Sequence, residues 1–341
     1  MILVSIIIST YNSEKFFVGR IDDLIAQSIF SESEILVVDS GSKQNEAKLI
    51  QPYLLKYKNI KYIRTEQRET IYMAWNRAIK LATGKYITNA NTDDRLRNDA
   101  LEVMVSYLEK YTDVDIVYAD QFVTSIENSN YDISKRMKST CRPKFRTIKL
   151  LERCIMGSQP MWRSKIHTHQ NIWYDQTLEI AGDYDFECNA LLKSKALLIP
   201  EVLGVYYLGR KNENKEFQKI ESTFDETFQI MFKYNSLYIN QLSAIQRKKM
   251  MKNLKYQTFL GKYLYSGFRK IFNLFFPRFE LMQRSYIYFL LALNEYLNHN
   301  LIKAKIYCLD YLKKSNSPII LRLLKEINLK LTNMESEKNC I

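Results

Sequence analysis

Cysteine and histidine are scarce in this chain of 341 residues, which contains five cysteines and three histidines. No two cysteines have the Cys-x-x-Cys spacing and their number is odd, so we expect reduced, mostly buried thiols and no disulfide framework. The histidines lack the spacing of zinc ligands. A metal site in this protein would therefore have to use carboxylate groups.

Long apolar runs are also missing, and the first residues lack the features of a signal peptide. Residues 1–4 carry no charged leader, and no cleavage site follows them. The aromatic stretch 263–278 is too short and too often interrupted by charges to span a bilayer. Together with the reduced thiols, these features indicate a cytoplasmic protein.

Basic residues are concentrated in the last third of the chain. Residues 1–210 carry 28 basic and 26 acidic side chains, whereas residues 211–341 carry 22 and 11 and account for +11 of the net charge of +13. This change predicts two domains, 1–210 and 211–341. A nucleic-acid partner is not expected, because the first domain is nearly neutral and no RNA- or DNA-binding motif is present.

The first domain alternates short β-branched runs with amphipathic segments, which predicts an α/β fold with a mainly parallel sheet flanked by helices. The expected strands are 2–8, 34–38, 60–64, 86–89 and 198–207, and the expected helices are 17–29 and 72–82. Ligands of such sheets bind at the carboxyl ends of the strands. Four polar residues follow these ends and are expected on one rim: Thr10, Asn12, Asp39 and Asp93.

Two adjacent acids, Asp93 and Asp94, follow the strand 86–89. They repel each other, and neither can be buried cheaply without an opposite charge. A divalent cation that carries a diphosphate would supply this charge, since Mg²⁺ and Mn²⁺ prefer hard oxygen ligands. The alternative is a solvated turn that caps the helix expected to begin near Arg97.

Four segments of the first domain resemble successive sequence blocks of the family 2 glycosyltransferases, which have the GT-A fold. These segments are residues 4–12, 35–42, 74–86 and 91–94. The resemblance implies that a sugar moves, with inversion, from a nucleotide-diphospho-sugar, in the first place a UDP-sugar, to a hydroxyl group of an acceptor. It also implies Mg²⁺ or Mn²⁺ as cofactor. The residues it assigns to nucleotide-sugar binding are Thr10, Asn12, Asp39, Asn76, Asn91 and Asp93.

The resemblance assigns the direct metal contact to Asp93, with Asp94 as a second ligand or as a residue behind it. Asn91 stands where the family has its first acid. An amide oxygen can still coordinate a hard cation or bind ribose, but it adds no negative charge. Metal binding is therefore expected to depend mainly on Asp93.

A second acidic segment, residues 182–186, stands where the family carries its general base, and Gly182 takes the place of a Glu. The resemblance makes Asp183 the base that deprotonates the acceptor hydroxyl and Asp185 a residue that binds hydroxyl groups, although the two roles could be exchanged. The alternative is helix capping by acids at an N-terminus. Gln159 and Trp162 stand where the family binds the acceptor, and Trp162 could equally be a core residue.

The C-terminal part is helical in pattern, and its segment 227–279 has ten basic residues, many aromatic residues and no acid. This composition predicts a helix in the membrane interface, in contact with anionic headgroups. The alternative is a helix packed on the first domain with a solvated basic face.

The resemblance, taken with this segment, implies a peripheral protein at the inner face of the cell membrane. It would act on a glycan or lipid-linked acceptor in surface polysaccharide or lipopolysaccharide biosynthesis. The rival hypothesis, suggested by Asn91 and Gly182, is a non-catalytic nucleotide-sugar-binding or membrane-associated scaffold derived from a transferase.

Overall fold

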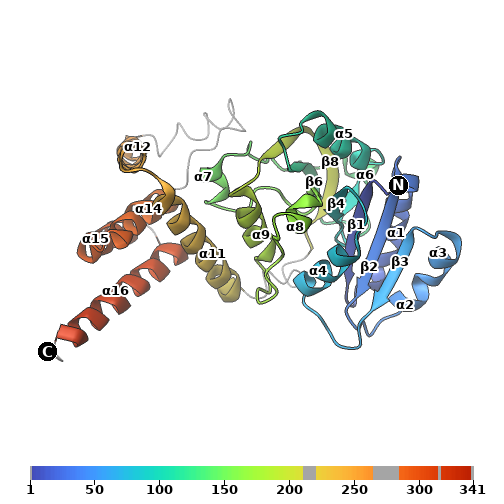
Figure 1. Ribbon diagram of the computed structural model, residues 1–341, viewed down its shortest axis with the longest axis horizontal. Coiled ribbons are helices and arrows are strands. Elements are labelled where there is room, and N and C mark those ends of the chain that lie inside the picture. The colour runs from blue at the N-terminus through green and yellow to red at the C-terminus, as the bar shows by residue number, and fades with distance from the viewer. Residues whose placement is uncertain (1, 210–219, 264–283, 314–315, 339–341) are drawn as a thin grey trace. The chain divides into compact units, whose positions relative to one another are not determined.

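The computed structural model describes residues 2–209, 220–263, 284–313 and 316–338. The chain forms two compact units (Figure 1). Unit 1 consists of Met1–Leu150 and Cys154–Ile220, and unit 2 consists of Leu151–Arg153 and Glu221–Ile341. The domain boundary predicted between residues 210 and 211 falls at a segment outside the described residues and stays a prediction.

Unit 1 is built on an eight-stranded sheet with the strand order β3-β2-β1-β4-β7-β6-β8-β5. Strands β3, β2, β1 and β4 run parallel, β7 runs antiparallel to both β4 and β6, and β8 runs parallel to β6. The predicted α/β fold with a mainly parallel sheet is confirmed. The strands are β1 (Val4–Thr10), β2 (Ser33–Asp39), β3 (Ile60–Arg64), β4 (Tyr86–Asn89), β5 (Arg95–Leu96), β6 (Ile116–Thr124), β7 (Met161–Arg163) and β8 (Ala196–Tyr207).

Helices flank this sheet, and the apolar sides of the longer ones complete the core. In α1 (Glu14–Ile25), Phe17, Ile21 and Leu24 recur at helical spacing and are buried against the sheet. The β-branched runs of β1 and β2 are buried throughout, as expected for strands covered on both faces. The other helical elements of unit 1 are η1 (Phe30–Glu32), α2 (Glu46–Leu49), α3 (Gln51–Lys56), α4 (Ile71–Leu81), α5 (Ala100–Lys110), α6 (Tyr131–Ser134), α7 (Thr147–Leu150), α8 (Lys165–Thr168) and α9 (Gly182–Leu191).

The parallel strands end along one rim of the sheet. In the pairing of β1 with β2, Thr10 lies opposite Asp39, and in the pairing of β2 with β3, Asp39 lies opposite Arg64. On the other side of β1, strand β4 ends at Asn89, which lies opposite Ile7. The turn that carries Asp93 follows directly, so the carboxyl ends of the strands bring the predicted polar residues to this rim.

Unit 2 is helical, which confirms the predicted α-helical C-terminal region. The buried amide of Asn235 joins its parts, because it donates to the Leu151 carbonyl at 3.0 Å and accepts from the Tyr286 hydroxyl at 2.7 Å. No helix among the described residues is long and apolar enough to cross a membrane. The helices are α11 (Ile220–Gln241), α12 (Ala244–Tyr263), α14 (Arg284–Leu297), α15 (Leu301–Leu312) and α16 (Pro318–Lys338).

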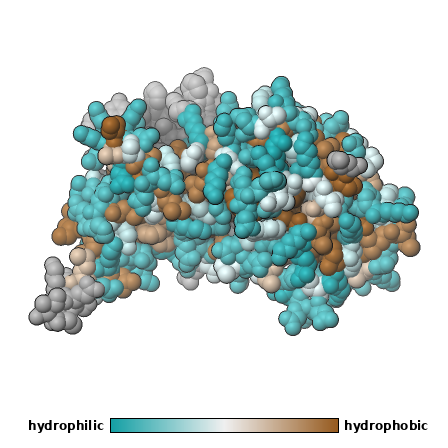
Figure 2. All heavy atoms as spheres, in the orientation of Figure 1, coloured by the Kyte–Doolittle hydropathy of each residue, from teal (hydrophilic) through white to brown (hydrophobic). Residues whose placement is uncertain are grey.

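Hydrophilic residues cover most of the molecular face drawn in Figure 2, and hydrophobic residues occur there in small groups. Most of the large apolar side chains are buried, for example Phe289 and Leu290 in α14. The predicted interfacial segment 227–279 is described only up to residue 263, and its remaining part, 264–279, lies outside the described residues.

Candidate active site of unit 1

Asp39, at the end of β2, is fully buried and both of its carboxylate oxygens accept hydrogen bonds. Oδ1 accepts from the Ser42 backbone N–H at 2.7 Å, and Oδ2 accepts from Arg64 at 2.7 Å and from the Tyr62 hydroxyl. Burial and the bond to Asp39 raise the pKa of Tyr62, which keeps its hydroxyl protonated as the donor. The Arg64 side chain is 43% exposed, so it is the partner of Asp39 that a ligand can reach.

Asn12 and Thr10 hold the turn after β1 in place. Asn12 has a left-handed backbone (φ +52°), and its Oδ1 accepts from the Lys43 backbone N–H at 2.8 Å and from the Ser42 hydroxyl at 3.2 Å. The Thr10 hydroxyl is hydrogen-bonded to the Ser13 hydroxyl at 2.7 Å. These bonds tie the turn after β1 to the turn after β2. Nucleotide binding by Thr10, Asn12 and Asp39 stays a prediction.

The two adjacent acids have different surroundings. Asp94 is buried, and its Oδ1 accepts from the Tyr207 backbone N–H at 3.0 Å. Burial and the charge of Asp93 raise the pKa of Asp94 to about 7. Asp93 retains some exposed surface, although burial raises its pKa as well. Asp93 is therefore the acid of the pair that a ligand can reach, whereas Asp94 holds the turn to β8.

Two buried arginines, Arg20 and Arg95, contact the backbone of this acid pair and bring positive charge close to it. Arg20 donates to Asp23 at 2.7 Å, to the Asp94 carbonyl at 3.1 Å and to Gln159 Oε1 at 2.5 Å. Arg95 donates to the same Asp94 carbonyl at 2.6 Å, and burial, with the nearby charge of Arg20, lowers the pKa of Arg95 to about 10. Sequence analysis missed Arg20, because it lies 74 positions before Asp94.

Gln159, a predicted acceptor residue, belongs to this network. Its side chain is buried, its Oε1 accepts from Arg20, and its Nε2 donates to the Arg95 carbonyl at 3.2 Å. Both ends of the amide are thus engaged within the protein. Gln159 therefore links Arg20 to the backbone of Arg95 next to the acid pair. Contact between Gln159 and an acceptor stays a prediction.

Among the described residues, no group of three or more His, Cys, Asp or Glu side chains could enclose a metal ion. Mg²⁺ is commonly held by one or two carboxylates together with phosphate and water oxygens. Asp93 is placed to supply such a carboxylate. Asn91, which is partly exposed, could add an amide oxygen.

The second acidic segment opens α9. Asp183 is partly exposed and its Oδ1 accepts from the Tyr184 backbone N–H at 2.8 Å, whereas Asp185 is buried. Gly182 lies against the Tyr72 ring, since a Cβ atom there would lie 2.6 Å from it. The Tyr72 hydroxyl donates to the Ile180 carbonyl at 2.6 Å. The Tyr72 ring therefore fills the space that a side chain at position 182 would need. This explains in steric terms why position 182 is Gly and not the Glu of the family pattern.

Glu187, one helical turn after Asp183, is a site residue that sequence analysis missed. It is buried and accepts hydrogen bonds from the backbone N–H groups of Ile155 at 3.1 Å and Met156 at 3.3 Å, and from the Cys154 thiol at 3.2 Å. Burial and the charge of Asp183 raise the pKa of Glu187 to about 8. Glu187 thus joins α9 to the segment that leads to Gln159. The spacing of four residues between Asp183 and Glu187 could have indicated this role, because residues four apart are neighbours on the surface of a helix.

Asn76 and Trp162 lie in the core of unit 1. Both ends of the Asn76 amide bond the Tyr174 backbone, at 2.9 Å to its carbonyl and 3.1 Å to its N–H. Trp162 has no exposed surface and donates from Nε1 to His167 Nε2 at 2.8 Å. Burial lowers the pKa of His167 to about 4, so it stays neutral and accepts. The structure favours the core alternative for Trp162, because an acceptor cannot reach a fully buried ring.

Residues 5–169 match the family model described as glycosyl transferase family 2. The chain is 30% identical over 188 residues to an uncharacterized glycosyltransferase of Methanocaldococcus jannaschii, a match that covers 54% of this chain and 63% of that protein. It is 26% identical over 212 residues to a poly(ribitol-phosphate) beta-glucosyltransferase of Bacillus spizizenii, covering 61% of this chain and 32% of that protein. The chain thus spans less than two thirds of the length of these curated relatives.

The fold is shared with solved structures. The crystal structure of Staphylococcus aureus TarS 1-349 in complex with UDP-GlcNAc superimposes with a TM-score of 0.62 at 16% sequence identity, over 97% of this chain and 92% of that one. A mannosyltransferase of Pyrobaculum calidifontis in complex with GDP-Man and Mn²⁺ superimposes with a TM-score of 0.52 at 15% identity, over 96% and 80%. With the family match and the mainly parallel sheet, these likenesses lead to one conclusion: residues 5–169 match the family 2 glycosyltransferases, and the fold is the GT-A fold.

Proposed function

We propose that this protein is an inverting glycosyltransferase that moves a sugar from a nucleotide-diphospho-sugar, in the first place a UDP-sugar, to an acceptor hydroxyl. The observations that support the proposal are that residues 5–169 match the family model, that Asp39 ends strand β2 and that Asp93 follows strand β4. TarS, which shares the fold, binds UDP and UDP-GlcNAc and so supports UDP. The names of two relatives support a polyol-phosphate or glycan acceptor.

In this mechanism the acceptor oxygen attacks the anomeric carbon as the bond from that carbon to the diphosphate oxygen breaks. Asp183 takes the proton from the acceptor hydroxyl, and the diphosphate departs with the bonding electrons. Mg²⁺ or Mn²⁺ bound at Asp93 would neutralise charge that develops on the leaving diphosphate. Arg20 and Arg95 both donate to the Asp94 carbonyl and so hold the turn that contains Asp93 and Asp94.

Glu187 supports Asp183 as the base rather than Asp185. With a pKa of about 8, Glu187 is mostly protonated at neutral pH, so it adds little negative charge one turn from Asp183. Asp185 is buried, which leaves it less accessible to an acceptor.

The location and pathway are further parts of the proposal. Domain 1–210 would carry out transfer at the cytoplasmic face of a membrane, and the basic segment 227–279 of domain 211–341 would contact anionic lipid. The acceptor would be a glycan or lipid-linked molecule in surface polysaccharide or lipopolysaccharide biosynthesis. The high basic content of α12, which has no acidic residue, supports the membrane contact.

A thermal-shift screen of nucleotide sugars with Mn²⁺, Mg²⁺ or EDTA tests the function, because a ligand of the native state raises the melting temperature. We expect a metal-dependent shift with one nucleotide sugar, and its loss in Asp93→Ala. Asp183→Asn should keep this shift and lose at least about a hundredfold in transfer rate. If the wild type shows no shift, the non-catalytic scaffold becomes the better hypothesis, and a fully active Asp183→Asn would remove Asp183 as the base.

A further inference from the structure

The helix α15 of unit 2 has apolar residues on two opposite faces. Its inner face packs against α14 and α16 (Figure 1). The buried residues of this face are Leu301, Ala304, Cys308 and Tyr311. On the outer face, Ile302, Ile306 and Leu309 recur at helical spacing and are 70%, 51% and 40% exposed. Because a surface helix normally carries polar residues opposite its buried face, these three residues, the α15 stripe, indicate a surface that binds a partner.

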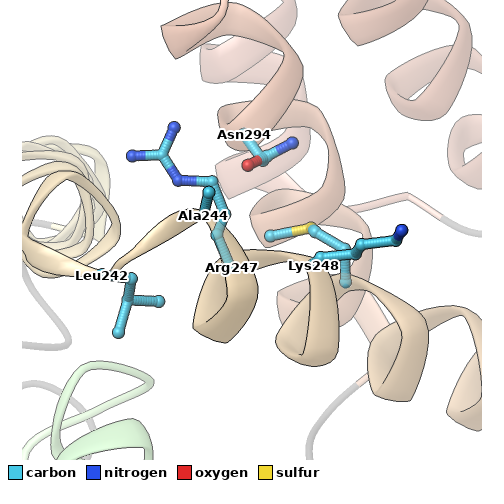
Figure 3. A pocket seen from close by; sticks show the side chains of 6 residues that line it. Leu242, Ala244, Arg247, Lys248 and Asn294 are labelled. Carbon is cyan, nitrogen blue, oxygen red and sulfur yellow. The ribbon is translucent and has the colours of Figure 1, made fainter.

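The α15 stripe is separate from the pocket in unit 2. That pocket has a volume of about 450 Å³ and is lined by residues between 242 and 251 and by Asn294 of α14, with no residue of α15 (Figure 3). Small molecules bind in concave sites, whereas the α15 stripe follows the outer side of a helix. The partner of the α15 stripe is therefore expected to be a large surface, either a protein or a membrane.

One edge of the α15 stripe carries a positive and a negative charge. Lys303 follows Ile302 along the helix, and Asp310 follows Leu309. Both charged residues thus lie on the same edge, about two helical turns apart. Their side chains are about half exposed, although each has an ion-pair partner within unit 2. This edge can therefore form further ion pairs with a partner that presents both signs of charge.

The charges on the two edges distinguish a protein partner from a membrane. Lys305 lies on the opposite edge, and Asp310 is the one acidic residue of α15. Anionic lipid would attract Lys303 and Lys305 alike and would repel Asp310. A second α15 that packs antiparallel, about a two-fold axis near Ile306, would bring the same edges together in opposite directions. Lys303 of each copy then lies near Asp310 of the other, so the pattern of charge is complementary to itself.

We propose that the α15 stripe is the contact surface between two copies of this chain, with α15 packed against α15 in antiparallel orientation. The contact is centred on a helix of 12 residues, about 18 Å long, and so is small compared with the interfaces of obligate dimers. We expect a reversible dimer with a dissociation constant of about 1–100 µM. The inference concerns unit 2 alone, and it holds whether or not unit 1 transfers sugar.

Sedimentation velocity of the full chain at concentrations from about 1 µM to about 200 µM tests the proposal. We expect the fraction of dimer to rise with concentration. Ile306→Glu should abolish the dimer, because it would bury two like charges near the axis. Leu329→Glu, the matched change at an exposed residue of α16 outside the α15 stripe, should leave the dimer unchanged. Both side chains are exposed in the single chain, so both variants should keep the melting temperature of the wild type.

The charges at the edges provide a second test. Lys303→Gln should weaken the dimer by about threefold or more, because it removes an ion pair from each end of the contact. Lys305→Gln loses the same charge from the same helix and should not weaken it, since the two copies of Lys305 would lie near each other. Asp310→Lys should weaken the dimer, and adding Lys303→Glu to the same chain should restore it, because the two charges are then exchanged.

The proposal is wrong if the wild type stays monomeric over the whole range of concentration, or if Ile306→Glu and Leu329→Glu affect the dimer equally. Equal weakening by Lys303→Gln and Lys305→Gln would contradict the antiparallel arrangement. A monomeric wild type that binds anionic vesicles, and loses this binding in Ile306→Glu, would assign the α15 stripe to a membrane instead.

Discussion

Glu187 carries a carboxyl group that its surroundings hold in the protonated form near neutral pH. Burial and the charge of Asp183 raise its pKa to about 8, from an ordinary value of 4.5. Between these two values the unfolded chain is ionised while the folded chain keeps its proton, so stability falls as the pH rises through this window. Below the lower value and above the higher one, both states have the same charge and this contribution is constant.

We expect Glu187→Gln to remove this pH dependence, because glutamine has nearly the same shape and does not titrate. Urea unfolding at about pH 5.5 and about pH 8.5 should show that the wild type loses more stability than the variant, by on the order of 1–3 kcal/mol. Glu66→Gln, a change at an exposed carboxylate, should behave like the wild type. Equal pH dependence in wild type and Glu187→Gln would contradict the raised pKa.

The acid pair Asp93–Asp94 shows which features of single residues can be predicted from the sequence and which cannot. Asp93 and Asp94 were found because two adjacent acids after a strand need a counter-charge. The sequence could not reveal that Arg20, from the first helix of unit 1, supplies part of that charge, since the contact spans 74 positions. The bond from Arg20 to Gln159 spans 139 positions and was equally hidden. Such contacts exist only once the sheet has assembled.

At the scale of elements, local pattern predicted the strands well where they are parallel and buried. The expected strands 60–64 and 86–89 coincide with β3 and β4, because β-branched and aromatic runs between turn signals are a local feature. Strands β5 and β6 were missed. Strand β5 has only two residues, and its pairing with β8 depends on an antiparallel partner far along the chain.

The packing of α4 against α9 gives a prediction at this scale. Gly182→Ala should destabilise unit 1 by about 1–3 kcal/mol, because the new methyl group would overlap the Tyr72 ring. Adding Tyr72→Leu should recover part of the loss, so the double variant costs less than the sum of the single changes. The free energies of urea unfolding of the four proteins measure this coupling.

Tyr72→Phe is the control for this pair, since it keeps the ring and removes only the hydrogen bond to the Ile180 carbonyl. It should cost about 1 kcal/mol alone and give no rescue of Gly182→Ala. Rescue by Tyr72→Phe, or additive effects of Tyr72→Leu, would mean that the ring does not exclude a side chain at position 182.

At the scale of the whole molecule, the positive charge is distributed unevenly between the two parts of the chain, which bears on the proposed binding to anionic membranes. The net charge is +13, and residues 211–341 contribute +11 of it. We propose that this basic part attracts anionic lipid, to which each basic side chain near the surface contributes about 1 kcal/mol. We expect substitutions of exposed lysines in it to change this attraction without disturbing the sheet unit.

We therefore expect co-sedimentation with vesicles that contain anionic lipid and little with neutral vesicles. Raising the salt from about 0.1 M to about 1 M should release the protein, because the Debye length falls from about 10 Å to about 3 Å. The double variant Lys249→Gln, Lys252→Gln in α12 should bind less, whereas Lys58→Gln, Lys110→Gln in unit 1, with the same loss of charge, should bind like the wild type. If both double variants bind equally weakly, the attraction comes from net charge alone and not from the segment 227–279.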